Sequence, residues 1–150
     1  MMTRVLFVCL GNICRSPSAE GIFRDLAAEA GLAVLTDSAG TSDWHVGSAP
    51  YAPMKEAALE RGFDLSDLRA RQFIAGDFDQ FDLIIGMDDS NLENIERLRP
   101  AGSQTPARIF TDFAPEIGMD HVPDPYYTRD FTQTLDLVQA ASRGLIKHLS

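Results

Sequence analysis

The sequence predicts an α/β fold. We expect one three-layer domain over residues 1–150, a four-stranded parallel sheet with strands in the order 2-1-3-4 and helices on both faces. The main observation is that short apolar runs, rich in strand-forming residues, alternate with longer segments of helical periodicity. Such alternation is typical of parallel strands joined by right-handed crossovers. The length of 150 residues suits one domain, and no repeat, low-complexity tract or linker divides it.

Four apolar runs are the expected strands. The first, residues 5–8, reads Val-Leu-Phe-Val, and a run without polar alternation indicates a strand buried on both faces. The other three are expected at residues 33–36, 82–87 and 107–110. Ligands of such sheets bind beyond the carboxyl ends of the strands, which points to the turn after residue 8.

Four segments have the apolar spacing of helices. The first contains Pro17 in its opening turn, has Ser16 as candidate N-cap and stops at Gly31. Asp88 is the candidate N-cap of the third. The helices are expected near residues 17–30, 53–61, 92–98 and 131–149, and residues 38–52 and 111–129 are expected to be loops.

Composition and charge narrow the possible partners. Asp and Glu total 22 against 13 Lys and Arg, a formal net charge of −9, which argues against nucleic acid or an anionic membrane as main partner. Two cysteines do not form a disulfide scaffold and indicate a reducing compartment. The apolar run at 5–10 is shorter than the roughly 7–15 residues of a signal-peptide core or ~20 of a membrane span. We therefore expect a cytoplasmic protein, and a monomer because no segment marks an obligate interface.

The turn after the first strand carries the strongest functional signal. Residues 9–17 read Cys-Leu-Gly-Asn-Ile-Cys-Arg-Ser-Pro, a strand-to-helix loop with a thiol at its start and an arginine near its end. Amides at a helix N-terminus, and consecutive amides curled around one point, both favour an anion. An acidic protein can therefore build a local positive site mainly from its backbone.

The side chains of this phosphate loop, residues 9–15, have physical uses. Arg15 presents a planar fork for two phosphate oxygens, and the spacing lets Arg15 and Cys9 reach one tetrahedral ion. The same surroundings favour the thiolate of Cys9, which can attack phosphorus, and Ser16 can donate a hydrogen bond to it. Gly11 can supply a positive φ if the curl requires one, and Asn12 can bond back to the loop backbone.

Other interpretations of the loop fit less well. A cysteine that ends a buried strand is often only a small apolar residue, but the glycine and the Ser-Pro helix start favour a site. A Walker A loop needs Gly-Lys-Ser/Thr and a Rossmann loop needs Gly-x-Gly-x-x-Gly, and neither is present. A zinc site is not expected, because Cys9 and Cys14 supply two ligands at most and the histidines are scattered at positions 45, 121 and 148.

At these residues the chain resembles the low-molecular-weight protein-tyrosine phosphatase family. Residues 5–17 look like the family's active-site signature, and the likeness covers nearly the whole chain, including residues 38–41, 70–72, 87–91 and 124–127. The resemblance implies hydrolysis of phosphotyrosine without a metal or other cofactor. It makes Cys9 the nucleophile that forms a phosphocysteine, Arg15 the phosphate clamp and Asp124 the general acid and base.

The resemblance also assigns the rest of the site. Asn12 and Ser16 shape the loop and the thiolate, and Ser38 and Asp88 support the site from behind. Cys14 is expected to form a reversible disulfide with Cys9 under oxidation. The residues expected to bind substrate or phosphate are Leu10, Gly11, Asn12, Ile13, Cys14, Ser16, Trp44, Tyr126 and Tyr127.

Chemistry supports the role of Asp124 independently. A phenolate leaves more easily when a carboxylic acid protonates it, and the ionised carboxylate can then activate water. Asp124 stands among prolines, a valine and two tyrosines, so it is partly desolvated and rigidly presented. The alternative is that Asp-Pro only starts a turn.

Trp44 and Tyr126 are flat aromatic groups that suit a phosphotyrosine ring.

Three alternatives stay open. A thioredoxin-coupled arsenate reductase of the same fold passes oxidation through three cysteines, whereas this chain has two. The related protein-arginine phosphatases have threonine in place of Ile13. A non-catalytic phosphotyrosine-binding module would keep Arg15 but needs no combination of Cys9 with Asp124. The expected partner is a phosphotyrosine-containing protein substrate, with a tyrosine kinase as a further candidate.

Overall fold

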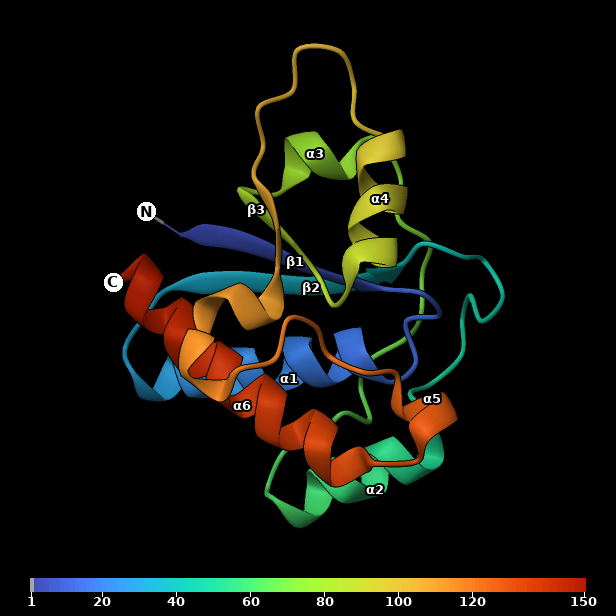
Figure 1. Ribbon diagram of the computed structural model, residues 1–150, viewed down its shortest axis with the longest axis vertical. Helices are drawn as coiled ribbons and strands as arrows, with labels where there is room; N and C mark the ends of the chain where they lie inside the picture. Colours follow the sequence, from blue (N-terminus) through green and yellow to red (C-terminus); the bar gives the residue numbers. More distant parts are fainter. Residues whose placement is uncertain (1) are drawn as a thin grey trace.

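The computed structural model describes residues 2–150 and contains one four-stranded parallel sheet (Figure 1). The strand order is β2-β1-β3-β4, so the predicted fold class and strand order are confirmed. The strands are β1 Thr3–Cys9, β2 Val34–Gly40, β3 Leu83–Gly86 and β4 Ala107–Ile109.

The central strand β1 is buried on both faces, as its apolar run predicts. It pairs with β2 on one side and β3 on the other. Val5 and Phe7 contribute to one hydrophobic core, whereas Leu6 and Val8 contribute to a second core across the sheet. Successive side chains of a strand point to opposite faces, so one short run supplies the centre of both cores.

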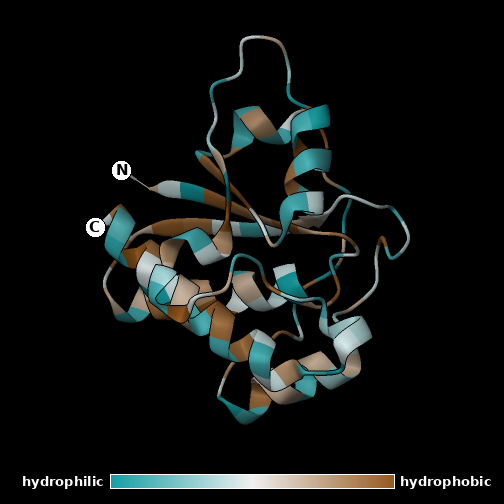
Figure 2. Ribbon diagram, viewed as in Figure 1, coloured by the Kyte–Doolittle hydropathy of each residue, from teal (hydrophilic) through white to brown (hydrophobic). Residues whose placement is uncertain are grey.

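Helices cover both faces of the sheet (Figure 1). Residues of α1, α2 and α6 pack in the core of Phe7, whose ring lies 5.5 Å from that of Phe23 in α1. On the other face, Phe78 of α3 and Ile95 of α4 pack against Leu6. Outside these contacts α4 is largely hydrophilic (Figure 2). The helices are α1 Arg15–Glu29, α2 Ala52–Glu60, α3 Asp77–Gln80, α4 Asp89–Arg97, α5 Pro125–Thr128 and α6 Phe131–Leu149.

Short elements account for most differences from the sequence prediction. The segment 111–129, expected to be a loop, contains 3₁₀ turns at Phe110–Phe113 and Pro115–Ile117 and the single turn α5. The four-residue helix α3 was also not predicted. Elements of one turn are too short to show a periodicity, so the apolar pattern cannot reveal them.

The prediction that Ser16 caps α1 is wrong. The helix begins two residues earlier than predicted, at Arg15, and its N-cap position is Cys14, which makes no side-chain capping bond. The Ser16 hydroxyl instead contacts Cys9 and Asn12. The helix start is therefore built around the phosphate loop rather than closed by a capping side chain.

Candidate active site

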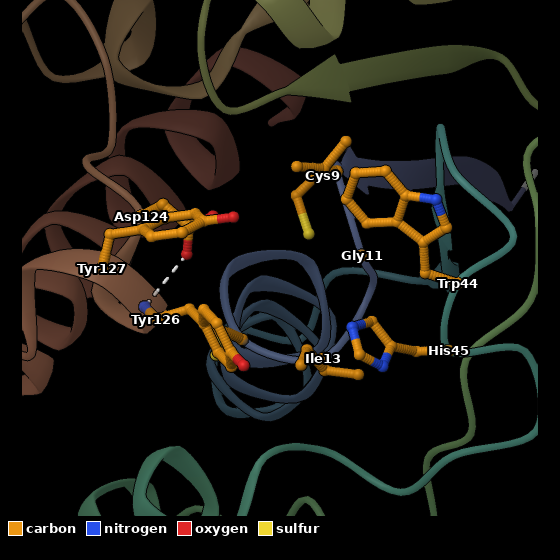
Figure 3. Close-up of a pocket in the computed structure, with 10 residues that line it drawn as sticks. Cys9, Gly11, Ile13, Trp44, His45, Asp124, Tyr126 and Tyr127 are labelled. Atoms are coloured by element: carbon orange, nitrogen blue, oxygen red, sulfur yellow. Dashed lines mark hydrogen bonds between the residues drawn. The ribbon is translucent and has the colours of Figure 1, made fainter.

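The phosphate loop lies where β1 ends and α1 begins. Cys9 is the last residue of β1 and Arg15 is the first of α1, so the loop turns at the carboxyl edge of the sheet. The acid-bearing segment, residues 122–130, reaches the same place from the far end of the chain. Figure 3 shows Asp124 across the cavity from Trp44, with Cys9 also lining it.

In the phosphate loop, backbone carbonyls are hydrogen-bonded to neighbouring segments, whereas backbone amides are left unpaired. The Cys9 carbonyl accepts a bond from the Thr41 amide at 2.9 Å, and the Ile13 carbonyl accepts one from the Tyr51 amide at 2.8 Å. In contrast, the amides of residues 11–16 donate to no acceptor among residues 2–150. Consecutive unpaired amides at a helix start form a local positive site.

The curl of the loop depends on Asn12 rather than on Gly11. Asn12 has a φ of 55°, whereas Gly11 is not among the residues with positive φ, so the expectation for Gly11 is wrong. Asn12 Nδ2 donates to Ser16 Oγ at 2.7 Å, and its Oδ1 accepts from the Arg71 amide at 3.0 Å. The side chain therefore bonds to the Ser16 hydroxyl and to the backbone of a neighbouring segment, not to the backbone of its own loop as expected. Asparagine tolerates the left-handed region better than most residues.

Close packing explains the glycines around the loop. A Cβ on Gly40 would lie 2.9 Å from the Leu10 carbonyl oxygen, and that atom belongs to rigid backbone. A Cβ on Gly11 would lie 3.0 Å from the ring of His45. The phosphate loop is therefore confined by the end of β2 and by the segment that follows it.

The Cys9 sulfur lies at the bottom of this loop, in contact with a hydroxyl. The side chain is 3% exposed, yet it lines the cavity. Its Sγ lies 3.0 Å from Ser16 Oγ, and Ser16 in turn accepts the bond from Asn12. The Ser16 hydroxyl also lies 3.5 Å from the Ala39 carbonyl oxygen, a longer contact than the one to sulfur. When its proton points at sulfur, the hydrogen bond stabilises a thiolate.

Arg15 is buried behind the cavity and joins three groups. Its Nη1 donates to Asp88 Oδ2 at 2.6 Å and to the Val122 carbonyl at 3.0 Å, and its Nη2 lies 3.5 Å from Asp124 Oδ2. Burial alone would lower the pKa of Arg15, but the negative charge of Cys9 and the bond to Asp88 outweigh it and raise the pKa. The guanidinium therefore stays charged at 3% exposure.

The carboxylates around Arg15 also cap helices. Asp124 is the N-cap of α5 and accepts from the Tyr126 amide through Oδ1 at 3.0 Å. Asp88 is the N-cap of α4, as expected, and accepts from the Asn91 amide at 2.8 Å. Each aspartate uses one oxygen for its cap and turns the other toward Arg15, so both are fixed in orientation.

The cavity has a volume of about 190 Å³ and aromatic walls. Tyr126 and Tyr127 lie beside Asp124 on one side, and Trp44 and His45 lie opposite (Figure 3). Trp44 is 67% and Tyr127 69% exposed, so both belong to the rim. The lining residues are Cys9, Leu10, Gly11, Ile13, Cys14, Trp44, His45, Asp124, Tyr126 and Tyr127.

Some predicted site residues lie behind the cavity. The side chains of Asn12 and Ser16 are buried and face each other. Ser38 donates to the buried carboxylate of Glu20 at 2.6 Å. Burial raises the pKa of Glu20, and this outweighs the opposing effect of the Ser38 bond. These bonds join α1 to the phosphate loop and to β2, and none of the four side chains lines the cavity.

The second cysteine also lines the cavity. Cys14 is a free thiol, and burial, followed by the negative charges of Cys9 and Asp124, raises its pKa far above the usual cysteine value. Cys14 is therefore a neutral thiol at physiological pH. Among residues 2–150, no three His, Cys, Asp or Glu side chains are grouped so that they could hold a metal ion. None of the helices in that range is long and apolar enough to cross a membrane.

Comparison with known proteins identifies the family. The family model described as low molecular weight phosphotyrosine protein phosphatase matches residues 4–150. The chain belongs to this family. It is therefore an enzyme of the phosphatase class, and the cavity at the phosphate loop is its candidate active site.

Individual relatives agree with the family assignment. The chain is 40% identical over 147 residues to the low molecular weight protein-tyrosine-phosphatase YfkJ of Bacillus subtilis, which covers 97% of this chain and 94% of the relative. The crystal structure of YfkJ has a TM-score of 0.92 at 39% identity, covering 99% of this chain and 94% of that one. A low molecular weight phosphotyrosine protein phosphatase of Schizosaccharomyces pombe is 45% identical over 127 residues, covering 83% and 81%. The crystal structure of a Drosophila arginine phosphatase has a TM-score of 0.88 at 29% identity, covering 96% of each chain.

Sequence reasoning missed several residues of this phosphatase site. His45 lines the cavity, and its position next to Trp44 was the available signal. Tyr51 bonds to the phosphate loop through its amide and to Arg129 through its hydroxyl. The Val122 carbonyl fixes Arg15 through the backbone, and a backbone contact leaves no residue-type signal.

Proposed function

We propose that the protein hydrolyses phosphotyrosine in proteins through a phosphocysteine at Cys9, with Arg15 as phosphate clamp and Asp124 as general acid and base. One observation supports this best: the unpaired amides of residues 11–16 surround a loop with the Cys9 sulfur at its start, and Asp124 lines the same cavity. An anion site, a nucleophile and a proton donor are thereby within reach of one phosphoryl group.

Substrate binding would use donors that the protein leaves free. The loop amides would donate hydrogen bonds to phosphate oxygens. Arg15 also has an Nε–H and one Nη2–H that donate to no described residue. A guanidinium edge of this kind can donate hydrogen bonds to two phosphate oxygens at once. The overall charge of −9 does not oppose this binding, because the positive field is local.

In the first chemical step, the Cys9 thiolate attacks phosphorus. A sulfur–phosphorus bond forms while the bond from phosphorus to the tyrosine oxygen breaks. Protonated Asp124 gives its proton to that oxygen, so that neutral tyrosine leaves. The loop amides and Arg15 stabilise the charge on the equatorial oxygens during the transfer.

In the second step, water replaces sulfur. Asp124, now ionised, takes a proton from a water molecule whose oxygen attacks phosphorus. The sulfur–phosphorus bond breaks, and Cys9 is restored as a thiolate next to Ser16. Inorganic phosphate leaves, and Asp124 ends protonated and ready for another turnover.

Aromatic walls favour phosphotyrosine over phosphoserine. Tyr126 and Trp44 flank the opening of the cavity, where the ring of a phosphotyrosine would lie. A phosphoserine is shorter and offers no ring to contact these walls. A cytoplasmic location is also part of the proposal, because both cysteines are free thiols. A monomeric state completes it, and light scattering should report the mass of one chain.

Phosphoarginine is the principal competing substrate, because a Drosophila arginine phosphatase shares the fold at 29% identity. Ile13 lines the cavity and favours phosphotyrosine, because the related protein-arginine phosphatases have threonine at this position. An arsenate reductase would need a third cysteine, and the chain has two. A pure binding module would bind phosphotyrosine without turnover.

A substrate-trapping experiment tests the proposal. Cys9→Ser should abolish turnover of p-nitrophenyl phosphate while it still binds inorganic phosphate, and the wild-type protein should lose activity in vanadate but keep it in EDTA. Cys9→Ser used as bait in an extract of the native cell should retain proteins that carry phosphotyrosine, with any cognate tyrosine kinase among them. Retention of phosphoarginine proteins alone would replace the substrate assignment, and a wild-type protein that leaves aryl phosphates intact would end it.

A further inference from the structure

We propose that Arg129 is a positioning residue that fixes α5 against Tyr51. Because Asp124 caps α5, this contact also holds the Asp124 carboxyl near the leaving oxygen of the substrate. This inference rests on the proposed function. Arg129 takes no part in the proposed chemical steps, lies outside the phosphate loop and does not line the cavity.

The acid-bearing segment is held firmly on its N-terminal side. The Val122 amide donates to the Met87 carbonyl at 2.8 Å, and the Val122 carbonyl accepts from Arg15 at 3.0 Å. Val122 itself is fully buried. The chain therefore enters the Asp124 turn from a fixed point.

On its C-terminal side the same segment is exposed, and Arg129 supplies the main polar bond to the rest of the protein. Its Nη1 donates to the Tyr51 hydroxyl at 2.8 Å, and its guanidinium lies 5.4 Å from the centre of the Tyr51 ring. The Tyr126 ring packs against Tyr51 as well, with 5.3 Å between centroids. Pro125 at the start of α5 is buried, whereas residues 126–129 are exposed, so without Arg129 this end of the turn would keep the ring contact of Tyr126 but lose its bond to Tyr51.

Tyr51 in turn is bonded to the phosphate loop. Its amide donates to the Ile13 carbonyl at 2.8 Å, just before the start of α2. The contacts therefore run from the phosphate loop to Tyr51, from Tyr51 to Arg129, and from Arg129 to the turn that carries Asp124. This chain of contacts fixes the acid relative to the nucleophile, and a general acid depends on such placement.

The backbone conformation of Arg129 is one that few residues other than glycine adopt. Its φ is 62°, in the left-handed region, where glycine would be unstrained. Its amide closes α5 by donating to the Pro125 carbonyl at 2.9 Å. Non-glycine residues in this region cluster at functional sites, where the surrounding contacts hold them in place, so the conformation agrees with a positioning role.

Leaving-group dependence tests this role. In Arg129→Ala, kcat/KM for phenyl phosphate, whose leaving group needs a proton, should fall roughly fivefold to tenfold, a part of the full general-acid effect. For p-nitrophenyl phosphate, whose leaving group needs none, kcat/KM should change less than about twofold. Arg129→Lys, which can still donate to Tyr51, should restore most of the loss. Arg129→Gly should show the same kinetic loss with no decrease in Tm, because glycine relieves the strain.

Two controls separate positioning from other effects. Arg61→Ala removes a comparable exposed arginine, which bonds Asp136 and Gln139 of α6, and should leave both kcat/KM values unchanged. In an Asp124→Ala background, Arg129→Ala should cause no further loss. Equal losses for both esters, no loss, or a loss that persists without Asp124 would overturn the inference. A wild-type protein inert toward both esters would instead refute the proposed function, and this inference with it.

Discussion

The phosphate loop and the acid-bearing segment meet at one cavity, but they are held in different ways. The loop follows the central strand, and its carbonyls bond to the segments that follow β2. The acid-bearing segment is a set of short turns. Beyond Val122 it is fixed by side chains, where Arg15 contacts Asp124 and Arg129 bonds to Tyr51. The anion site is therefore rigid and preformed, whereas the position of the acid depends on a few polar contacts that a substitution can remove.

Arg15→Lys breaks the contact between the two regions and should have the largest effect. Lysine cannot bond Asp88, the Val122 carbonyl and two phosphate oxygens together, as the guanidinium fork can. We expect kcat/KM for aryl phosphates to fall by about 10²–10³, as for the loss of an oriented donor to the transition state. Steady-state kinetics measure this, and a loss below about tenfold would show that Arg15 does not clamp the phosphate.

Asp124→Asn isolates the proton from the structure of the acid-bearing segment. Asparagine still caps α5, so thermal unfolding should change little. Turnover of phenyl phosphate should fall by roughly 10² or more, and that of p-nitrophenyl phosphate much less, because only the poorer leaving group needs protonation. If both esters lost activity equally in parallel assays, Asp124 would not be the acid.

Cys14→Ser tests whether the rigid loop protects its own nucleophile. Cys14 is a neutral thiol beside the cavity, where it can condense with an oxidised Cys9 to form a disulfide. After brief peroxide treatment, dithiothreitol should restore most of the wild-type activity but much less of the Cys14→Ser activity. Equal recovery in the two proteins, measured by residual p-nitrophenyl phosphatase activity, would remove the protective role.

Glu20→Gln should have the smallest effect, on stability. Burial raises the pKa of Glu20, so the folded state binds its proton more tightly than the unfolded state does. The free energy of unfolding should therefore fall as pH rises from the ordinary glutamate range through the raised folded value. Glutamine keeps the Ser38 bond and carries no charge, so the variant should gain stability relative to wild type, by about 1.4 kcal/mol for each unit of raised pKa.

Urea unfolding of wild type and Glu20→Gln at pH 5 and pH 8 measures this difference. If the difference in free energy of unfolding between the two proteins did not change with pH, the pKa of Glu20 would not be raised in the folded state. The kinetic constants should not separate the two proteins, because Glu20 is buried and does not line the cavity.

The fold and the loop could be predicted because their signals are local. The alternation of apolar runs determines the sheet, and residues 9–15 are contiguous in the sequence. The end of β2 was missed because Ser38 and Gly40 look like loop residues, although they pair with Phe7 and Cys9 in the sheet. Tertiary pairing with the central strand outweighs their weak strand propensity.

The contacts of the acid-bearing segment could not be predicted, because they join distant residues. Arg129 and Tyr51 are 78 positions apart, and no spacing rule relates them. The positive φ of Asn12 follows from its bonds to Ser16 and to the Arg71 amide. A single sequence shows which residues tolerate such a conformation but not which residue adopts it.

The central claim is that Cys9 accepts the phosphoryl group inside the ring of loop amides. Its most direct test mixes Asp124→Asn with p-nitrophenyl phosphate, quenches the reaction in denaturing alkali and locates the phosphoryl group by peptide mass spectrometry. Cleavage after Arg4 and Arg15 leaves both cysteines in one peptide, so fragmentation must distinguish them. We expect one phosphoryl group on Cys9, and no phosphoryl group on the variant Cys9→Ser. Turnover without a phosphorylated Cys9, or a phosphoryl group on another residue, would contradict it.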